Sequence, residues 1–152
     1  MPYEITMLPG TSASSPSSDR LEVVQRSFGI TLSHDYVDFL RSTNGGIPIR
    51  RYFSLAGNEK VVERFLSLVE AYKADPLGIY DIEVVWSQIE ERLNDSLVPI
   101  AEVFAGDFLC LDFSKSSEPA VILWDHEKSR VDVPYLMPVA PSLGHFIEML
   151  HD

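Results

Sequence analysis

The chain has 152 residues, and its 12 Lys and Arg against 23 Asp and Glu give a formal net charge of −11 and a sequence pI of about 4.7. A chain of that length fits one domain whose core needs no disulfide or metal, and the single cysteine excludes an intrachain disulfide. Nucleic acid and anionic lipid attract Lys and Arg, so we expect neither as a direct partner.

The sequence also lacks the segments that direct a protein to a membrane. No apolar run approaches the ~20 residues that span a bilayer. The N-terminus, Met1 to Thr6, has neither the basic nor the apolar region that secretory signals carry. We therefore expect a soluble protein of a reducing compartment, the cytoplasm, with no membrane contact.

Composition divides the chain once. Residues 10–18 read Gly-Thr-Ser-Ala-Ser-Ser-Pro-Ser-Ser, the only low-complexity stretch. Such a sequence favours a flexible or extended backbone over a packed element. We therefore expect residues 1–17 to be a lead-in and residues 18–152 to form a single domain.

Two helices are expected next. Ser18 is a suitable N-cap for a short amphipathic helix that ends at Gly29, a residue that adopts positive φ at little cost. A second helix is expected to begin at Ser33 or His34. The Asn44-Gly45-Gly46 segment, whose residues tolerate positive φ, is expected to end it.

The middle of the chain predicts a strand followed by two more helices. Residues 47–55 alternate loosely and predict one strand or a bent hairpin. The third helix is expected to be capped by Asn58 and the fourth by Asp81. Helical spacing supports the third at Val62, Phe65, Leu66 and Val69, and the fourth at Ile82, Val85, Trp86, Ile89 and Leu93.

Short apolar runs between turn-like segments predict antiparallel strands in the second half. They cover residues 97–101, 108–113, 120–124 and a stretch around 131–135, with residues 125–129 as a turn. Pro134 and Pro138 favour an edge position for the last strand. A closing helix is expected from Ser142. Because the helices come mostly first and the strands later, we expect an α+β fold, an antiparallel β-sheet with helices packed against it.

No catalytic or metal-binding signature is present in the sequence. Asn44-Gly45-Gly46 lacks the spacing of a phosphate-binding loop. Asp125-His126-Glu127 are consecutive, and neighbours on an extended chain point to opposite sides, which favours a turn over a metal site. Cys110 has no adjacent cation to lower its pKa, which favours a packed thiol over a nucleophile. We expect no catalytic residue, metal or cofactor. A hydrolytic enzyme that uses carboxylates near Asp107, Asp112 and His126 is the remaining alternative.

The acidic residues are unevenly distributed. Between Asp75 and Glu118, ten acidic residues stand against two basic ones. Such a surface attracts basic proteins, although solubility alone is the simpler alternative. The residues expected to contact a partner lie on the outward side of the predicted fourth helix and beside it: Asp75, Glu83, Glu90, Glu91 and Asp95. Trp86 and Trp124 are expected in the core, or as interface anchors if exposed.

Several short motifs, taken in order, resemble a known family. Leu32-Ser33-His34-Asp35-Tyr36 with Phe39-Leu40 and Asn44-Gly45-Gly46 resembles the LP-x-DY-x-x-FL-x-x-x-NGG segment of the SUKH superfamily. Residues 97–101, 106–112 and 121–127 are similar to its LVPIA, GD-x-LCLD and V-x-x-WDHE elements, and residues 139–150 to its closing helix. Ser33 and Leu143 stand where the family usually has Pro and often has Phe, and both substitutions suit a helix.

The resemblance covers residues 18–150 and implies an α+β fold without catalysis. The superfamily includes the fungal Smi/Knr cell-wall regulators and many bacterial immunity proteins, which are cytoplasmic antidotes encoded beside polymorphic toxins, often nucleases. The implied function is to bind and occlude a cognate toxin domain that is basic. The alternative is a general regulatory or scaffold module of the Smi/Knr type. The resemblance transfers no site residues and leaves the oligomeric state open.

Overall fold

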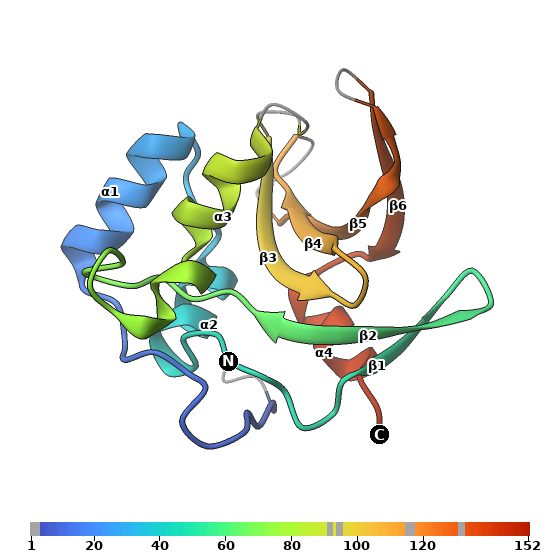
Figure 1. Ribbon diagram of the computed structural model, residues 1–152, viewed down its shortest axis with the longest axis horizontal. Helices are drawn as coiled ribbons and strands as arrows, with labels where there is room; N and C mark the ends of the chain where they lie inside the picture. Colours follow the sequence, from blue (N-terminus) through green and yellow to red (C-terminus); the bar gives the residue numbers. More distant parts are fainter. Residues whose placement is uncertain (1–3, 91–92, 94–95, 115–117, 131–132) are drawn as a thin grey trace.

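The computed structural model describes residues 4–90, 93, 96–114, 118–130 and 133–152. In this part of the chain, four α-helices and one 3₁₀ helix accompany a six-stranded antiparallel sheet whose order, β1-β2-β3-β4-β5-β6, follows the sequence (Figure 1). The α+β prediction is confirmed. None of the described helices has the length and apolar character needed to cross a membrane.

Helices precede, interrupt and follow the strands along the chain (Figure 1). The helices are α1 (Ser18–Phe28), α2 (His34–Ser42), η1 (Pro76–Tyr80), α3 (Ile82–Ile89) and α4 (Leu143–Met149). The strands are β1 (Tyr52–Leu55), β2 (Asn58–Phe65), β3 (Leu97–Val103), β4 (Asp107–Asp112), β5 (Ala120–Arg130) and β6 (Val133–Ala140). α3 packs against β3, with α1 on the other side of α3, whereas α4 packs against β5 and β6 (Figure 1).

Helix boundaries follow capping signals close to those predicted. α1 begins after Ser17, one residue before the expected cap, because the Ser17 hydroxyl accepts a hydrogen bond from a first-turn N–H at 3.0 Å. It ends at Gly29, which has a φ of 66°. α3 begins after Asp81, as predicted, because the carboxylate accepts hydrogen bonds from two first-turn N–H groups. α4 begins after Ser142, also as predicted.

The helix predicted after Asn58 is wrong, because residues 58–65 form β2, which pairs with both β1 and β3. The turn between β1 and β2 consists of Ala56 and Gly57, which adopt positive φ values of 51° and 82°. A two-residue turn with positive φ fits the right-handed twist of the strands it joins. The apparent helical spacing arose because the buried residues of β2 are followed by a buried loop, residues 66–69.

Asn44 lies just past the end of α2, but it bridges segments of the fold, a role beyond ending a helix. Its amide nitrogen donates to Ser14 O at 2.7 Å and to Leu68 O at 2.8 Å, and its amide oxygen accepts from Leu68 N at 2.8 Å. Gly45 has a φ of 72°, and a Cβ there would lie 2.7 Å from the Leu66 carbonyl oxygen. The segment therefore needs an amide side chain followed by a glycine for a structural reason.

The described N-terminal residues, 4–17, run beside this bridging segment. Ala13 N donates to Asn44 O at 3.0 Å. Leu8 N donates to Ile47 O at 2.7 Å. These backbone hydrogen bonds hold the lead-in against the chain between α2 and β1 (Figure 1).

β5 is longer than predicted. Residues 125–129, expected to form a turn, belong to β5, in which Asp125 pairs with Tyr135 of β6 before the register becomes irregular. β6 lies at one edge of the sheet, as Pro134 and Pro138 predicted, because a residue without an N–H is tolerated on an edge strand. The polar sequence after the apolar part of β5 therefore continues the hairpin.

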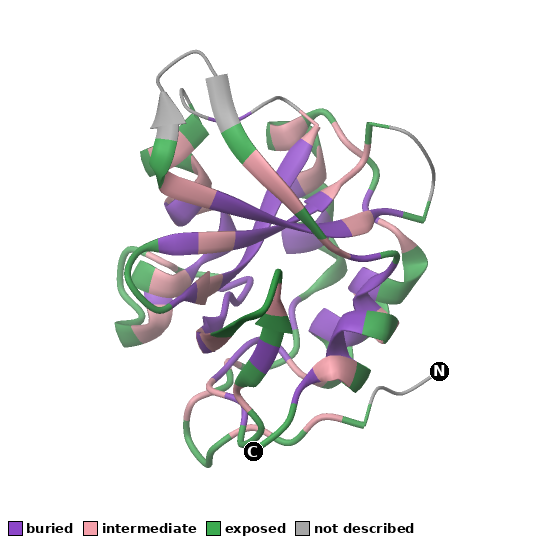
Figure 2. Ribbon diagram, turned by 90° about the vertical axis from the view of Figure 1, so that its right-hand side faces the viewer, coloured by how far each residue is buried: buried purple, intermediate pink, exposed green. Residues whose placement is uncertain are grey.

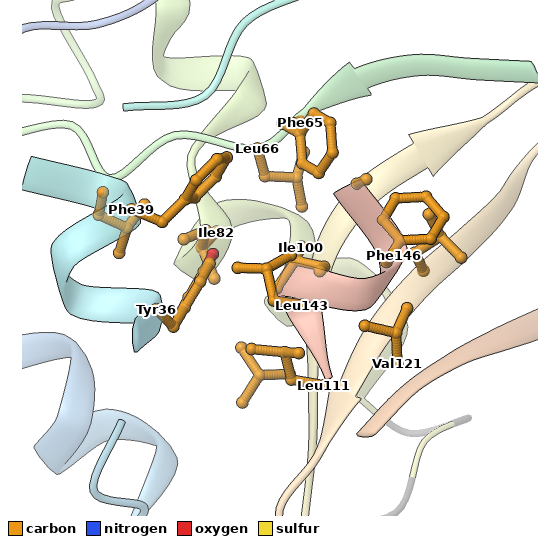
Figure 3. Close-up of a cluster of buried hydrophobic side chains, with 14 of the residues drawn as sticks. Tyr36, Phe39, Phe65, Leu66, Ile82, Ile100, Leu111, Val121, Leu143 and Phe146 are labelled. Atoms are coloured by element: carbon orange, nitrogen blue, oxygen red, sulfur yellow. The ribbon is translucent and has the colours of Figure 1, made fainter. Parts of the chain in front are cut away.

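Apolar residues are buried on both faces of the sheet, and the helices keep their exposed residues outward (Figure 2). Figure 3 shows the centre of the larger cluster, with Tyr36, Phe39, Phe65, Leu66, Ile82, Ile100, Leu111, Val121, Leu143 and Phe146 labelled. The smaller cluster contains Leu93, Leu97, Cys110, Ile122 and Trp124. Alternation along β4 produces this division, because Leu109 and Leu111 face the larger cluster and Cys110 the smaller.

Cys110 is fully buried, as the packed-thiol prediction requires. Burial raises the pKa of its thiol, and the nearby charge of Asp112 raises it further. A thiol that resists ionisation in this way is a poor nucleophile. Cys110 therefore contributes to packing in the smaller cluster.

Candidate functional site

Glu83, expected on the solvent side of α3, is held by an internal ion pair. Its carboxylate accepts a hydrogen bond from Arg20 Nη1 at 2.9 Å and another from Ser27 Oγ at 2.6 Å. The side chain is 24 % exposed. Desolvation opposes ionisation of Glu83, but the hydrogen bonds from Ser27 and Arg20 outweigh it and lower the pKa. Glu83 therefore ties α3 to α1 and presents little free charge to a partner.

Arg20 and Asp81 form a buried ion pair beside Glu83. Arg20 Nη2 lies 3.1 Å and 3.0 Å from the two carboxylate oxygens of Asp81, and Arg20 Nε donates to Val69 O at 2.8 Å. The Arg20 side chain is 7 % exposed and that of Asp81 is fully buried. Asp81 also accepts from Val69 N at 2.8 Å. This one carboxylate thus caps α3, accepts a hydrogen bond from the loop after β2 and neutralises Arg20 of α1.

The other predicted contact residues near α3 divide into two groups. Asp75 and Glu90 are exposed, and they stand at the two ends of the continuous η1–α3 segment. Asp75 uses one carboxylate oxygen to accept from Leu77 N at 2.9 Å, which starts η1. Glu91 and Asp95 lie outside the described residues. The exposed carboxylates at Asp75 and Glu90 are therefore the part of the predicted surface that the structure describes as open to solvent.

The two tryptophans differ in burial. Trp124 is 1 % exposed and belongs to the smaller cluster, where its ring lies 6.0 Å from that of Phe108. Trp86 of α3 is half-buried and meets Phe28 of α1 edge to face, with 5.1 Å between the ring centroids. Both tryptophans pack inside the fold, as the sequence predicted, because each ring contacts an aromatic ring of a neighbouring element.

The structure brings Asp107, Asp125 and His126 together at one end of the β4–β5 pairing. Each side chain offers one atom that could ligate a metal ion, and these three atoms lie within 4.8 Å of one another. His126 approaches Asp107 through Nδ1 at 2.6 Å and donates its backbone N–H to the same carboxylate at 3.0 Å. Asp125 accepts from the backbone N–H groups of Glu127 and Lys128, both at 3.0 Å. Convergence of these side chains was not expected from the consecutive triplet, and it arises because Asp107 comes from a second strand.

The carboxylates proposed for a hydrolytic enzyme do not form a pair. Asp107 begins β4 and Asp112 ends it. At roughly 3.4 Å per residue the two Cα atoms are about 17 Å apart, which is beyond the separation that paired glycosidase carboxylates use. Asp112 instead accepts from Ser114 N at 2.9 Å. Asp107 is hydrogen-bonded to His126, and this pair joins the start of β4 to β5.

A cavity of about 850 Å³ lies where the start of α2 meets the start of β3 and the end of β4. Its polar lining includes His34, Asp35 and Glu118, and its apolar floor includes Leu32 and Leu111. At its edge, Ser142 Oγ lies 2.7 Å from His145 Nδ1 and accepts from His145 N. That Ser–His contact is the N-cap of α4.

Comparison with known protein families matches residues 15–149 to the SMI1 / KNR4 family (SUKH-1). The chain belongs to the SMI1/KNR4 (SUKH-1) family. It is also similar to a relative in Bacillus subtilis (strain 168), the SPbeta prophage-derived uncharacterized protein YokK, with 21 % identity over 168 residues that cover 98 % of this chain and 82 % of the relative.

Several polar residues of this SMI1/KNR4 member serve the fold itself. Asn44 bridges three segments, Asp81 pairs with Arg20, and Asp107 pairs with His126. Each partner lies at least 19 residues away along the chain. These polar side chains therefore serve the architecture, and a partner-contact surface must be sought among other, exposed residues.

Proposed function

We propose that this SMI1/KNR4 family protein is an immunity protein that binds a cognate basic toxin domain and occludes it without chemistry of its own. Family membership across residues 15–149 is the observation that supports the proposal most strongly, and the net charge of −11 supports the basic character of the partner. Because an immunity protein of this kind acts inside the cell that makes it, the proposal includes a cytoplasmic location.

Exposed carboxylates supply the attraction. The described surface carries exposed acidic side chains on several elements, among them Asp19, Glu22, Asp35, Asp38, Asp75, Glu90 and Glu148. A summed negative field of this kind speeds the approach of a basic partner and repels competing acidic proteins. If the toxin is a nuclease, its substrate groove is basic, so the immunity protein would match the same charges that bind the nucleic acid.

The proposed contact surface consists of Asp75, which precedes η1, and Glu90, which follows α3. It also includes Glu91 and Asp95, which lie outside the described residues. Glu83 has a positioning role in this proposal, because Arg20 and Ser27 already occupy its carboxylate. Solvent-exposed charges at the rim of an interface change mainly the association rate and its salt dependence.

Survival of cells that express a toxin tests the proposal. The toxin domain encoded beside this gene is expressed with and without the protein, and we expect survival only with it. Two matched variants separate surface from net charge: Asp75→Lys with Glu90→Lys, and Asp38→Lys with Glu148→Lys. We expect the first to protect less than the second. Death with wild-type protein present, together with binding to several unrelated proteins, would favour the general scaffold module instead.

A further inference from the structure

Phe104 is a largely exposed aromatic residue whose backbone N–H is hydrogen-bonded to the sheet. It occupies the turn between β3 and β4 and is 66 % exposed. Its N–H donates to Val61 O at 2.9 Å, so the β2–β3 pairing continues up to it. Ala105 and Gly106 follow with positive φ values of 77° and 95°. A large apolar ring fixed on such a turn exposes apolar area without a packing reason inside the chain.

A second aromatic ring and a carboxylate lie beside Phe104 on the same face of the sheet. Alternation along β3 places Glu102 on the side of Phe104. Phe108 of β4 is the cross-strand partner of Glu102. Phe108 is half-buried, and its ring centroid lies 6.0 Å from that of Trp124 in the smaller cluster. The three residues therefore form an aromatic-carboxylate patch, defined here as Glu102, Phe104 and Phe108.

The carboxylate of Glu102 has no hydrogen-bond donor within the described part of the chain. Burial raises its pKa, and the neighbouring charge of Glu63 raises it further. Arg64 faces Glu102 in the β2–β3 register and lowers the pKa, but its guanidinium stacks on Tyr80 at 3.9 Å and donates to Thr11 O at 3.0 Å. A half-buried carboxylate left in this state gains much from a cation that reaches it.

Resting on the proposed function, we propose that the aromatic-carboxylate patch is the docking site for an arginine side chain of the basic partner. The guanidinium binds Glu102, and its planar face stacks on Phe104 while its aliphatic stem covers Phe108. Charge selects this occupant, because Glu63 and Glu102 repel an anion and would stay unpaired under a purely apolar partner. Arginine fits better than lysine, since its planar group both stacks on aromatic rings and binds carboxylates in a fork.

Titration of the full chain with short peptides, followed by NMR of the backbone amides, tests this assignment. The probe is an acetylated and amidated Gly-Gly-Arg-Gly-Gly peptide, and the matched controls carry Lys or the uncharged isostere citrulline. We expect shift changes centred on Glu102, Phe104 and Phe108, weaker changes with Lys and none with citrulline. Glu102→Gln is expected to weaken arginine binding about tenfold and Phe104→Ser about two- to fivefold. Glu148→Gln, an equal change at an exposed position of α4, is expected to leave binding unchanged.

Three outcomes of the titration would overturn the docking site. The first is equal binding of the arginine and citrulline peptides. The second is a set of shifts centred on Asp75 and Glu90. The third is loss of the patch signals on concentrating the protein alone, which would make a second copy of the chain the occupant. In cells, full protection by both Glu102→Gln and Phe104→Ser would overturn this inference yet leave the immunity function standing, whereas failure of wild-type protein to protect would overturn the function itself.

Discussion

Replacing Asp81 with Ala removes the side chain that joins three segments of the fold, and we expect a large loss of stability. The substitution leaves Arg20, 7 % exposed, without the carboxylate that lies 3.0 Å away, and it removes the acceptor for Val69 N and the cap of α3. Removing one partner of a buried ion pair costs about 3–5 kcal/mol. Because Glu83 still accepts from Arg20 Nη1, the expected cost lies toward the lower end of that range.

Urea unfolding at 25 °C, followed by circular dichroism, measures this loss. Asp75→Ala is the matched control, because Asp75 also caps a helix with its carboxylate but is exposed. Loss of such an exposed cap costs about 0.5–1 kcal/mol. A variant with both Arg20→Met and Asp81→Asn should lose less than the sum of its parts, because neither charge is then left alone. If Asp81→Ala cost no more than Asp75→Ala, the assignment of Arg20 and Asp81 as the main polar tie of the fold would be refuted.

Three further expectations follow from individual residues. Cys110 should react with a thiol reagent only at the rate of unfolding, because burial raises its pKa; rapid labelling of the folded protein would contradict that burial. Gly45→Ala should lower the free energy of unfolding in urea more than Gly29→Ala does. Both glycines have positive φ, which costs another residue about 1–3 kcal/mol of strain, but only at Gly45 would the Cβ also meet the Leu66 carbonyl oxygen. Equal losses of stability would argue against that close approach. Glu102→Gln should raise the melting temperature near pH 7. The pKa of Glu102 is raised in the folded protein, so its carboxyl stabilises the fold only while it is protonated. That contribution is lost as pH rises through the folded pKa, whereas Gln stays neutral. The gain should vanish below about pH 4, where Glu is protonated in both states, and an unchanged melting temperature near neutral pH would contradict it.

Local signals in the sequence were sufficient for much of the fold. Three helix ends lie where the sequence predicted them, at Gly29, Asp81 and Ser142. These ends are predictable because a cap acts through hydrogen bonds or φ values within one turn. The strands β3 and β4 were recognisable from apolar runs between turns. β6 was expected at an edge for a reason equally local, the missing N–H of proline.

The two wrong predictions, a helix after Asn58 and a turn at residues 125–129, have the same physical origin. In both, strand pairing overrode the local sequence pattern. The spacing after Asn58 imitated a helix because a strand ran into a buried loop, and the turn before it was concealed because Ala56, a residue that rarely adopts positive φ, occupies its first position. The sequence at 125–129 was polar enough to predict a turn, yet pairing with β6 extends β5 through it. β2 also pairs with β3, where Phe65 faces Ala101, and that distant partner is not visible in a short window of sequence.

The candidate site was less predictable than the fold. Glu83 lies on the expected helix, but its carboxylate is hydrogen-bonded to Arg20, which lies 63 positions away in the sequence. The aromatic-carboxylate patch was missed because Glu102 and Phe108 come together only through the β3–β4 register. Phe104 offered one signal that could have been used, since it is a large apolar residue placed directly before Ala105-Gly106 in a turn.

The salt dependence of binding between the purified protein and the purified toxin domain tests whether negative charge drives recognition of a basic partner. Both the association rate and the affinity, measured by surface plasmon resonance between about 50 mM and 500 mM salt, should fall steeply, because screening shortens the reach of the exposed carboxylates. Absence of binding at low salt, or an association rate that does not change with salt, would contradict the account of an acidic protein that occludes a basic partner.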